Sequence, residues 1–129
     1  MDDTRLNFKE MCARFDVTPR TLRYYEYIEL LSPQKEGRAR FYGPREIARM
    51  TLILRGRSFG IGLEEIRQWL ELYEKKGTVA QYEAFLEMAD RQLAVLEQQI
   101  TDLQAARSGL QSLRAETLNE ITRLQKAAS

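Results

Sequence analysis

Arginines and hydroxyl-bearing side chains gather between residues 18 and 42 in a pattern that suits binding to DNA. Residues 18–26 read Thr-Pro-Arg-Thr-Leu-Arg-Tyr-Tyr-Glu, and residues 38–42 read Arg-Ala-Arg-Phe-Tyr. A DNA-binding surface needs cations and hydroxyls on one rigid face, because phosphates dominate affinity and the edges of the bases supply specificity. The candidate contacts that meet this need are Arg20, Thr21, Arg23, Tyr24, Arg38 and Arg40.

The same stretch also has a purely structural interpretation. Tyr24, Tyr25 and Tyr42 could be half-buried packing residues with arginine side chains extended around them. We favour packing for Tyr25, and we favour DNA binding for the four arginines taken together.

The net charge of +1 hides an asymmetry between the two halves of the chain. Residues 1–60 hold 12 Lys and Arg against 8 Asp and Glu, whereas residues 61–129 hold 8 against 11. A basic half joined to an acidic half suggests two tasks, one of which involves a polyanion. The alternative is an ordinary solvated surface.

The composition excludes several classes of function. The chain has no histidine, so chemistry that needs imidazole is excluded, and its one cysteine, Cys12, excludes disulfide frameworks and Cys-rich zinc sites. No glycine-rich phosphate loop or paired carboxylates remain to support catalysis. We therefore expect no catalytic residues, no metal and no cofactor. The chain also lacks a membrane-spanning apolar run and a signal-peptide core at its start, which predicts a cytoplasmic protein.

Two short helices are expected to position the basic residues. A tight turn at residues 16–17 separates a first helix from a second over 18–28, where Thr18 is a good N-cap and the proline after it suits the first helical position. This is the helix-turn-helix arrangement. The apolar residues that recur at helical spacing in the first helix are Phe8, Met11, Cys12 and Phe15.

Residues 31–42 read as a short basic β-hairpin with a turn at 35–37, because Arg38, Arg40 and Tyr42 alternate with two less polar residues. A two-stranded hairpin is too small to be stable alone, so it must pack on the helices as a wing. A third helix is expected over about 44–57, and a fourth is expected after a break at 58–62 and is closed by residues 75–77. The predicted fold is mainly α, with a winged helix-turn-helix domain over residues 1–77.

The rest of the chain, residues 78–129, is predicted to be one long dimerisation helix. Its apolar residues step by 4, 3, 4, 3, 4 and 3, which is a coiled-coil seam. A helix of nearly fifty residues would be about 70 Å long, and its cheapest partner is a second copy. Gly109 costs about 1 kcal/mol relative to alanine, so we expect a kink or fray there. The seam starts at Tyr82, and the candidate dimerisation residues are Leu86, Ala89, Leu93, Leu96, Ile100, Leu103 and Leu110.

Residues 6–75 resemble the MerR family of bacterial transcription regulators. The resemblance lies in Leu22-Arg-Tyr-Tyr-Glu26, the Leu30-Leu31 pair, the Arg-x-Phe-Tyr wing and the helix that follows. It implies a homodimer joined by an antiparallel coiled coil. It also implies binding to a pseudo-palindromic promoter whose spacer is bent and untwisted, so that RNA polymerase is affected through the DNA.

The resemblance also implies roles for individual residues. The helix over 18–28, beginning at Thr18 and including Thr21, would enter the major groove. There Arg20 and Arg23 would read bases or phosphates and Tyr24 would contact a phosphate. Arg38, Arg40 and Tyr42 would supply the wing contacts, and Arg55 a further phosphate contact. The sequence departs from the family at Lys9, Asp16 and Glu29, where glycine is frequent. Glu29 must take up a left-handed conformation at some cost or end the helix differently.

No effector is identified by the sequence. Residues 78–129 contain neither cysteine nor histidine, and Cys12 lies on an apolar helix face where packing is favoured over sensing. The short coil is weakly similar to family members that govern acyl-CoA or branched-chain amino-acid catabolism. A candidate effector pocket, which we consider more typical of plain core, consists of Phe59, Trp69, Tyr73, Tyr82 and Phe85.

The sequence therefore predicts a homodimeric, sequence-specific DNA-binding transcriptional regulator. The alternative is a coiled-coil adaptor whose head binds DNA without sequence preference or not at all. A steep dependence of DNA affinity on salt would favour the first.

Overall fold

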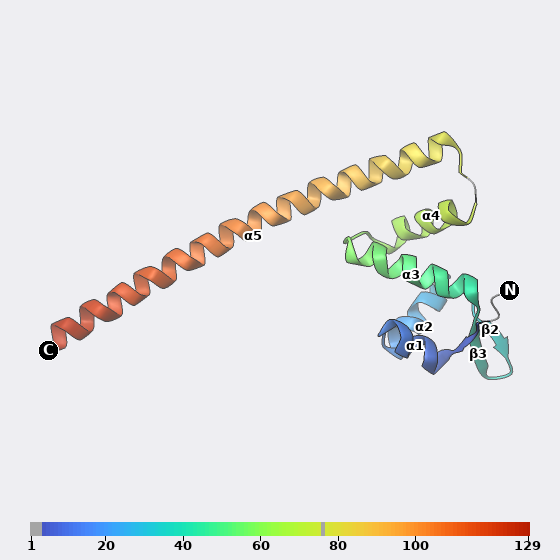
Figure 1. Ribbon diagram of the computed structural model, residues 1–129, viewed down its shortest axis with the longest axis horizontal. Helices are drawn as coiled ribbons and strands as arrows, with labels where there is room; N and C mark the ends of the chain where they lie inside the picture. The colour runs from blue at the N-terminus through green and yellow to red at the C-terminus, as the bar shows by residue number, and fades with distance from the viewer. Residues whose placement is uncertain (1–3, 76) are drawn as a thin grey trace. The chain divides into compact units, whose positions relative to one another are not determined.

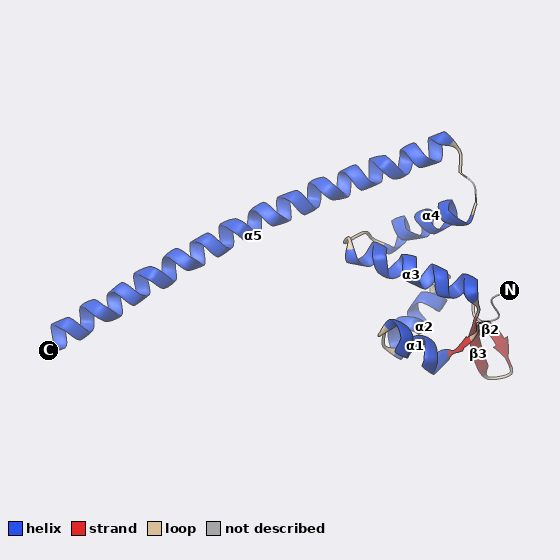
Figure 2. Cartoon of the chain, viewed as in Figure 1, coloured by secondary structure: helices blue, strands red, loops and turns tan. Residues whose placement is uncertain are grey.

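The computed structural model describes residues 4–75 and 77–129, apart from the side chain of Tyr73. It divides into two compact units, Met1–Phe85 and Leu86–Ser129. The order of elements (Figures 1 and 2) confirms the predicted fold class. In sequence they are β1 (Leu6–Asn7), α1 (Phe8–Phe15), α2 (Pro19–Tyr27), β2 (Gln34–Glu36), β3 (Ala39–Tyr42), α3 (Pro44–Ser58), α4 (Leu63–Glu74) and α5 (Val79–Ala128).

Local hydrogen bonds explain why α1 and α2 begin and end where they do. Asn7 accepts a hydrogen bond from the backbone N–H of Glu10 at 2.8 Å, and the Glu10 carboxylate accepts one from the Asn7 N–H at 2.9 Å, which is a capping box. Asp16 ends α1 in the left-handed region with φ of 51°. Thr18 then caps α2 by accepting from the Thr21 N–H at 3.1 Å.

The end of α2 shows how the chain accommodates Glu29. This residue adopts φ of 64°, the left-handed conformation that glycine usually supplies. The Glu29 N–H donates to the Glu26 carbonyl at 3.0 Å, and the Leu30 N–H donates to the Tyr25 carbonyl at 2.9 Å. These two bonds form a Schellman motif. The sequence left open whether Glu29 adopts a left-handed conformation or the helix ends differently, and the structure shows the left-handed conformation.

The wing belongs to a three-stranded antiparallel sheet in the order β1-β3-β2. The hairpin of β2 and β3 was expected and turns at Gly37, whose φ is +62°. Strand β1 was not expected, because two residues are too few to show an alternating pattern. Its pairing of Leu6 with Tyr42 joins the start of the chain to the wing (Figure 2).

The core of the first unit lies where α1, α2, α3, α4 and β3 meet. Helices α3 and α4 approach closely at Gly56, since a Cβ added there would lie 2.8 Å from Ile66 Cγ1. The fully buried side chains are Met11, Leu22, Leu30, Leu31, Tyr42, Met50, Ile53, Ile66 and Leu70. Side chains of α2 and of the wing strand β3 therefore pack in the same core.

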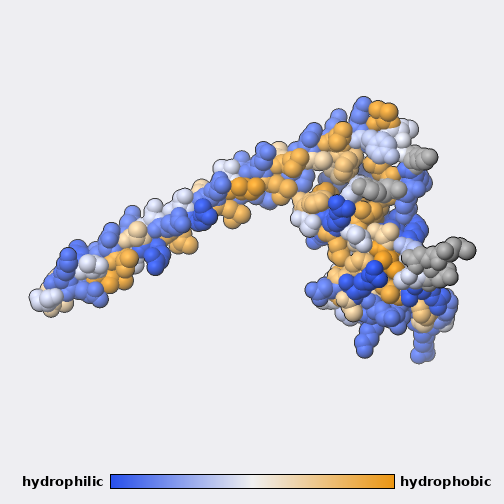
Figure 3. Space-filling view, in the orientation of Figure 1, coloured by the Kyte–Doolittle hydropathy of each residue, from blue (hydrophilic) through white to orange (hydrophobic). Residues whose placement is uncertain are grey.

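Helix α5 runs without interruption over 50 residues. It continues through Gly109, so the fray expected there is absent. Apolar residues recur along it among polar ones (Figure 3). Large apolar side chains on it that remain exposed include Leu86, Leu93, Ile100, Leu103, Leu110, Leu113, Leu118, Ile121 and Leu124.

Candidate nucleic-acid interface

Helix α2 divides its side chains between the core and solvent. Leu22 and Tyr25 are buried, at 0% and 6% exposure, so packing is confirmed for Tyr25. Arg20 and Arg23 are exposed, and Tyr24 keeps 49% of its surface in solvent. The Thr18 hydroxyl, besides capping the helix, donates to Thr21 Oγ1 at 2.9 Å. The outward face of α2 thus presents two guanidinium groups and a phenol.

A shallow groove of about 560 Å³ lies along this face. It extends from α2 to the last turn of α3 and the start of α4, because Arg57 and Leu63 form part of its wall. Arg57 was not singled out in the sequence, where Arg55 was named instead. Arg55 is exposed but lines neither this groove nor the next one. The lining residues are Arg20, Thr21, Arg23, Tyr24, Tyr25, Tyr27, Arg57 and Leu63.

A second groove, of about 360 Å³, lies between α1, α2 and the wing. Arg23 belongs to both grooves, so it joins the recognition face of α2 to the wing. The ring of Phe8 lies 5.3 Å from the guanidinium carbon of Arg23 and 5.6 Å from that of Arg40. The residues that line the groove are Asn7, Phe8, Lys9, Arg23, Arg38, Ala39 and Arg40.

Tyr42 is buried, contrary to its expected role in DNA contact. Its exposure is 0%, and its hydroxyl donates a hydrogen bond to Glu26 Oε1. Burial raises the pKa of Tyr42, and the bond to the Glu26 carboxylate raises it further. The expectation that Tyr42 contacts DNA therefore does not fit the structure. Since Arg40 lies 3.3 Å from the other Glu26 oxygen, Tyr42 and Glu26 together hold the wing arginine against α2.

Arg5 holds the wing from the other side and was not identified from the sequence. Its guanidinium lies over the ring of Phe41, 3.7 Å from the centroid, and reaches Glu36 Oε1 at 2.8 Å and Oε2 at 3.4 Å. The hydrogen bond from Arg5, with the attraction of its charge, lowers the pKa of Glu36. Arg5, the residue before β1, thus contacts both strands of the hairpin.

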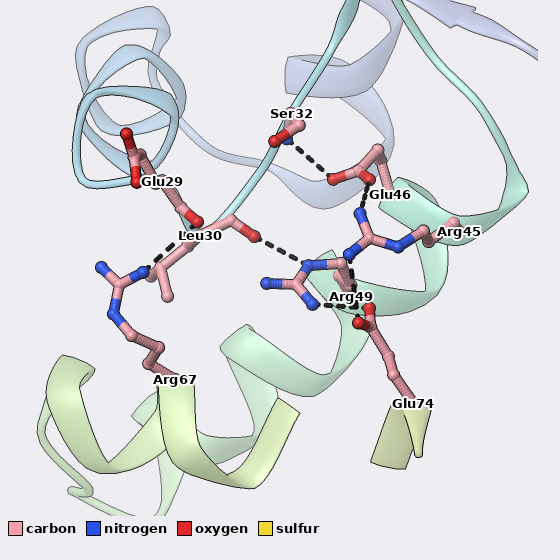
Figure 4. Close-up of polar contacts among 8 residues, drawn as sticks. All are labelled: Glu29, Leu30, Ser32, Arg45, Glu46, Arg49, Arg67 and Glu74. Carbon is pink, nitrogen blue, oxygen red and sulfur yellow. Dashed lines mark hydrogen bonds and ion pairs between the residues drawn. The ribbon is translucent and has the colours of Figure 1, made fainter. Parts of the chain in front are cut away.

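The turn after α2 is held by side chains from α3 and α4 (Figure 4). Arg67 donates to the carbonyls of Ile28 and Glu29, which satisfies the C-terminal end of α2. Arg49, which is only 8% exposed, donates from Nε to the Leu30 carbonyl at 2.8 Å. The Glu46 carboxylate accepts from the Ser32 N–H at 2.9 Å.

Glu74, the last residue of α4, connects Arg49 to a further arginine of α3, Arg45. It lies 2.5 Å from Arg49 and 3.0 Å from Arg45, and Arg45 also pairs with Glu46 (Figure 4). Burial alone would raise the pKa of Glu74, but the hydrogen bonds and charges of Arg49 and Arg45 outweigh it and lower that pKa. The network therefore joins the C-terminal end of α2 to α3 and α4.

The aromatic residues considered for an effector pocket are placed in different surroundings. Trp69 is 5% exposed and stacks on Phe85, with ring centroids 5.9 Å apart, which suits a core role for both. Phe59 and Tyr82 are exposed at 43% and 50%, and the Tyr73 side chain lies outside the described residues. Among the side chains that the structure describes, no three His, Cys, Asp or Glu residues form a candidate metal site. Burial raises the pKa of the Cys12 thiol, which disfavours the thiolate form that reacts or binds metal.

The candidate dimerisation residues all lie on α5. Leu86, Leu93, Ile100, Leu103 and Leu110 are exposed, and Ala89 and Leu96 are partly exposed. No helix in the described part of the chain is both long enough and apolar enough to cross a membrane.

Comparison with known proteins points to one family. Residues 6–73 match the profile of the family described as MerR HTH family regulatory protein, and residues 47–113 match the profile described as MerR, DNA binding. The chain is 30% identical over 109 residues to the HTH-type transcriptional regulator HmrR of Rhizobium leguminosarum bv. viciae, which covers 84% of this chain and 83% of that protein.

Solved structures give the same result. A MerR-family transcriptional regulator from Bacillus cereus superposes with a TM-score of 0.68 at 27% identity, over 81% of this chain and 76% of the other. HiNmlR, a MerR-family regulator lacking the sensor domain and bound to promoter DNA, superposes with a TM-score of 0.61 at 17% identity. That match covers 78% of this chain and 76% of the other, and at this identity it shows likeness of fold.

Proposed function

Because the chain belongs to the MerR family of helix-turn-helix transcriptional regulators, we propose that α2 reads the major groove of promoter DNA. Members of this family are regulators and not enzymes, and we assign this chain no reaction. The observation that carries the proposal is the joined pair of grooves around Arg23, which places the cations of α2, α3 and the wing on connected surfaces.

Within this surface the residues divide into two groups. Arg20, Thr21 and Arg23 project from the first two turns of α2, the part of a recognition helix that meets base edges. Arginine can bind guanine with two parallel hydrogen bonds, so Arg20 and Arg23 are the residues suited to reading sequence. Tyr24, Arg38 and Arg40 are suited to phosphates, which fix register and orientation.

Two copies bind the promoter together. As a MerR regulator the chain acts as a dimer, and α5, with its exposed apolar stripe, is our proposed dimerisation element. A two-fold symmetric dimer reads two half-sites of a pseudo-palindrome. We further propose that residues 1–77 bind DNA, that residues 78–129 dimerise, and that the dimer bends and untwists the promoter spacer. We also propose that the protein acts in the bacterial cytoplasm, where promoter DNA lies.

Selection of bound fragments from a random DNA pool, at low and at moderate salt, tests this function. Recovery of an inverted repeat at both salt concentrations is the expected result. Binding that disappears with salt and recovers no shared sequence would contradict sequence-specific reading. Absence of binding would favour the adaptor alternative.

A matched pair of variants tests whether the surface of α2 is responsible for sequence-specific DNA binding. Arg20→Ala with Arg23→Ala removes two cations from α2 and should abolish recovery of the repeat. Arg107→Ala with Arg114→Ala removes the same charge from α5 and should leave recovery unchanged. Equal loss in both variants would mean that only net charge matters.

A further inference from the structure

The groove between α1, α2 and the wing contains four cationic side chains and no carboxylate in its lining. Three of them, Arg23, Arg38 and Arg40, come from α2 and the wing hairpin. The fourth is Lys9, an exposed residue in the first turn of α1. The first helix of the helix-turn-helix therefore contributes a cation to the same surface as the recognition helix.

Most of this positive charge is not neutralised by the protein. Arg40 lies 3.3 Å from Glu26. Within the residues that the structure describes, Lys9, Arg23 and Arg38 make no ion pair with a carboxylate. The nearby Glu10 carboxylate is engaged by the backbone N–H of Asn7 in the capping box of α1 and does not line the groove. An anion that enters the groove would meet several donors at once.

Phe8 fixes the spacing of two of these cations. Its ring lies 5.3 Å from the guanidinium carbon of Arg23 and 5.6 Å from that of Arg40. The attraction between a ring face and a guanidinium holds each group near the ring although the two cations repel one another. Phe8 therefore keeps one guanidinium from α2 and one from β3 at the same groove.

We propose that this groove binds one phosphate of the DNA backbone, with Lys9 as a further phosphate contact and Phe8 as the residue that positions Arg23 and Arg40. The inference rests on the proposed function, since α2 must lie in the major groove for a backbone to pass between α2 and the wing. A phosphate there takes hydrogen bonds from the forked guanidinium groups of Arg38 and Arg40 and from Lys9 acting as a point charge. Arg23, which also lines the groove along α2, keeps its proposed role in reading bases.

The test measures binding of Lys9→Ala to the operator recovered by selection, by fluorescence anisotropy over a range of salt. Affinity should fall about threefold to tenfold for each copy in the dimer. The slope of log affinity against log salt should fall by about 0.9 for each copy, because one phosphate contact is lost. The loss should be equal on a scrambled duplex, since phosphate contacts carry no sequence information. Lys9→Arg keeps the charge and should keep the slope.

The control is Arg14→Ala, which removes a cation from the last turn of the same helix outside the groove. It should leave affinity and slope unchanged. Phe8→Leu keeps an apolar side chain but removes the ring, and it should weaken binding in the wild-type background more than in an Arg23→Ala background. An additive effect would contradict the positioning role.

The outcomes separate this inference from the function on which it rests. If Lys9→Ala binds with the affinity and salt slope of the wild type while Arg23→Ala is weakened, the inference is overturned and the proposed function stands. If the wild-type protein binds no duplex, both are overturned.

Discussion

Arg49 on α3 donates from Nε to the carbonyl oxygen of Leu30 at 2.8 Å, and Leu30 lies 19 residues earlier in the chain. Leu30 is the residue that closes the Schellman motif of α2, so this bond holds the end of α2 on α3. The same guanidinium reaches Glu74 at 2.5 Å, which adds α4. A single buried side chain thus connects the C-terminal end of α2 to α3 and α4 (Figure 4).

Replacing Arg49 should destabilise the protein through this connection. Arg49→Ala leaves the Leu30 carbonyl and the Glu74 carboxylate without their donor, and we expect the free energy of unfolding to fall by about 2–4 kcal/mol. The control is Arg14→Ala, which removes an exposed cation from the last turn of α1, outside this network, and whose loss should be below about 1 kcal/mol. Urea unfolding at a fixed protein concentration measures both. Equal losses would show that Arg49 is no more than a surface charge.

The strained residue after α2 predicts a stabilising substitution. Glu29→Gly removes the side chain that disfavours φ of 64°, and its backbone bonds to Glu26 and Arg67 remain possible. We expect a gain of about 0.5–1.5 kcal/mol in the free energy of unfolding. Glu29→Ala is the matched control, because alanine keeps the Cβ and should gain nothing comparable. Thermal unfolding that gives the same midpoint for both variants would contradict a backbone origin.

The sequence predicts the fold well where local chemistry decides the outcome. The cap at Thr18, the turn at Asp16 and the seam of α5 depend on near neighbours in the chain, and their elements appear as expected. The failures come from long-range packing. Tyr42 is a residue type that suits a wing contact with DNA, but its hydroxyl donates a hydrogen bond to Glu26, sixteen residues away.

The phosphate contact expected at Arg55 stays a prediction, and the groove along α2 includes Arg57, which the sequence analysis did not name. Both are basic residues in the last turn of α3, and the sequence pattern does not show how the helix is rotated about its axis. Packing of Gly56 against Ile66 sets that rotation, and it leaves Arg57 in the groove along α2. Strand β1 was missed because its two residues matter only through pairing with β3.

The position of Arg57 in the groove along α2 predicts a contribution of this residue to DNA binding. Arg57→Ala should lower affinity for the operator and reduce the salt slope by about 0.9 for each copy, as loss of a phosphate contact does. Arg55→Ala, two residues earlier, should change neither by as much, because Arg55 lies outside both grooves. Anisotropy titrations at several salt concentrations compare the pair. The reverse order of effects would restore the assignment that the sequence alone suggested.

Acid should weaken the network behind α2 through Glu74. Its arginine partners lower the pKa of Glu74 in the folded protein below the value of a free glutamate. A carboxyl with a lowered folded pKa contributes stability above its unfolded pKa of about 4.3, and loses that contribution as pH falls through the folded value. Glu74→Gln should therefore be less stable than the wild type at pH 7, with the difference shrinking below about pH 4. Unfolding curves at both pH values check this, and a constant difference would contradict it.

The apolar stripe on α5 predicts what happens when charge is placed in the seam. Leu96→Glu with Ile100→Glu puts four carboxylates into one dimer interface and removes four apolar side chains, each contributing about 1.5–3 kcal/mol when buried. We expect sedimentation equilibrium to show monomers at concentrations where the wild type is a dimer.

The control for the seam carries the same two charges at the same spacing. Ala94→Glu with Gln98→Glu places them away from the 4-3 pattern, and this variant should remain dimeric. Helicity offers an independent measurement, because an unpaired helix of 50 residues has lost the packing that stabilises it in water. Far-UV circular dichroism should therefore fall for the seam variant and not for its control. A seam variant that stays dimeric and helical would show that the copies associate through another surface.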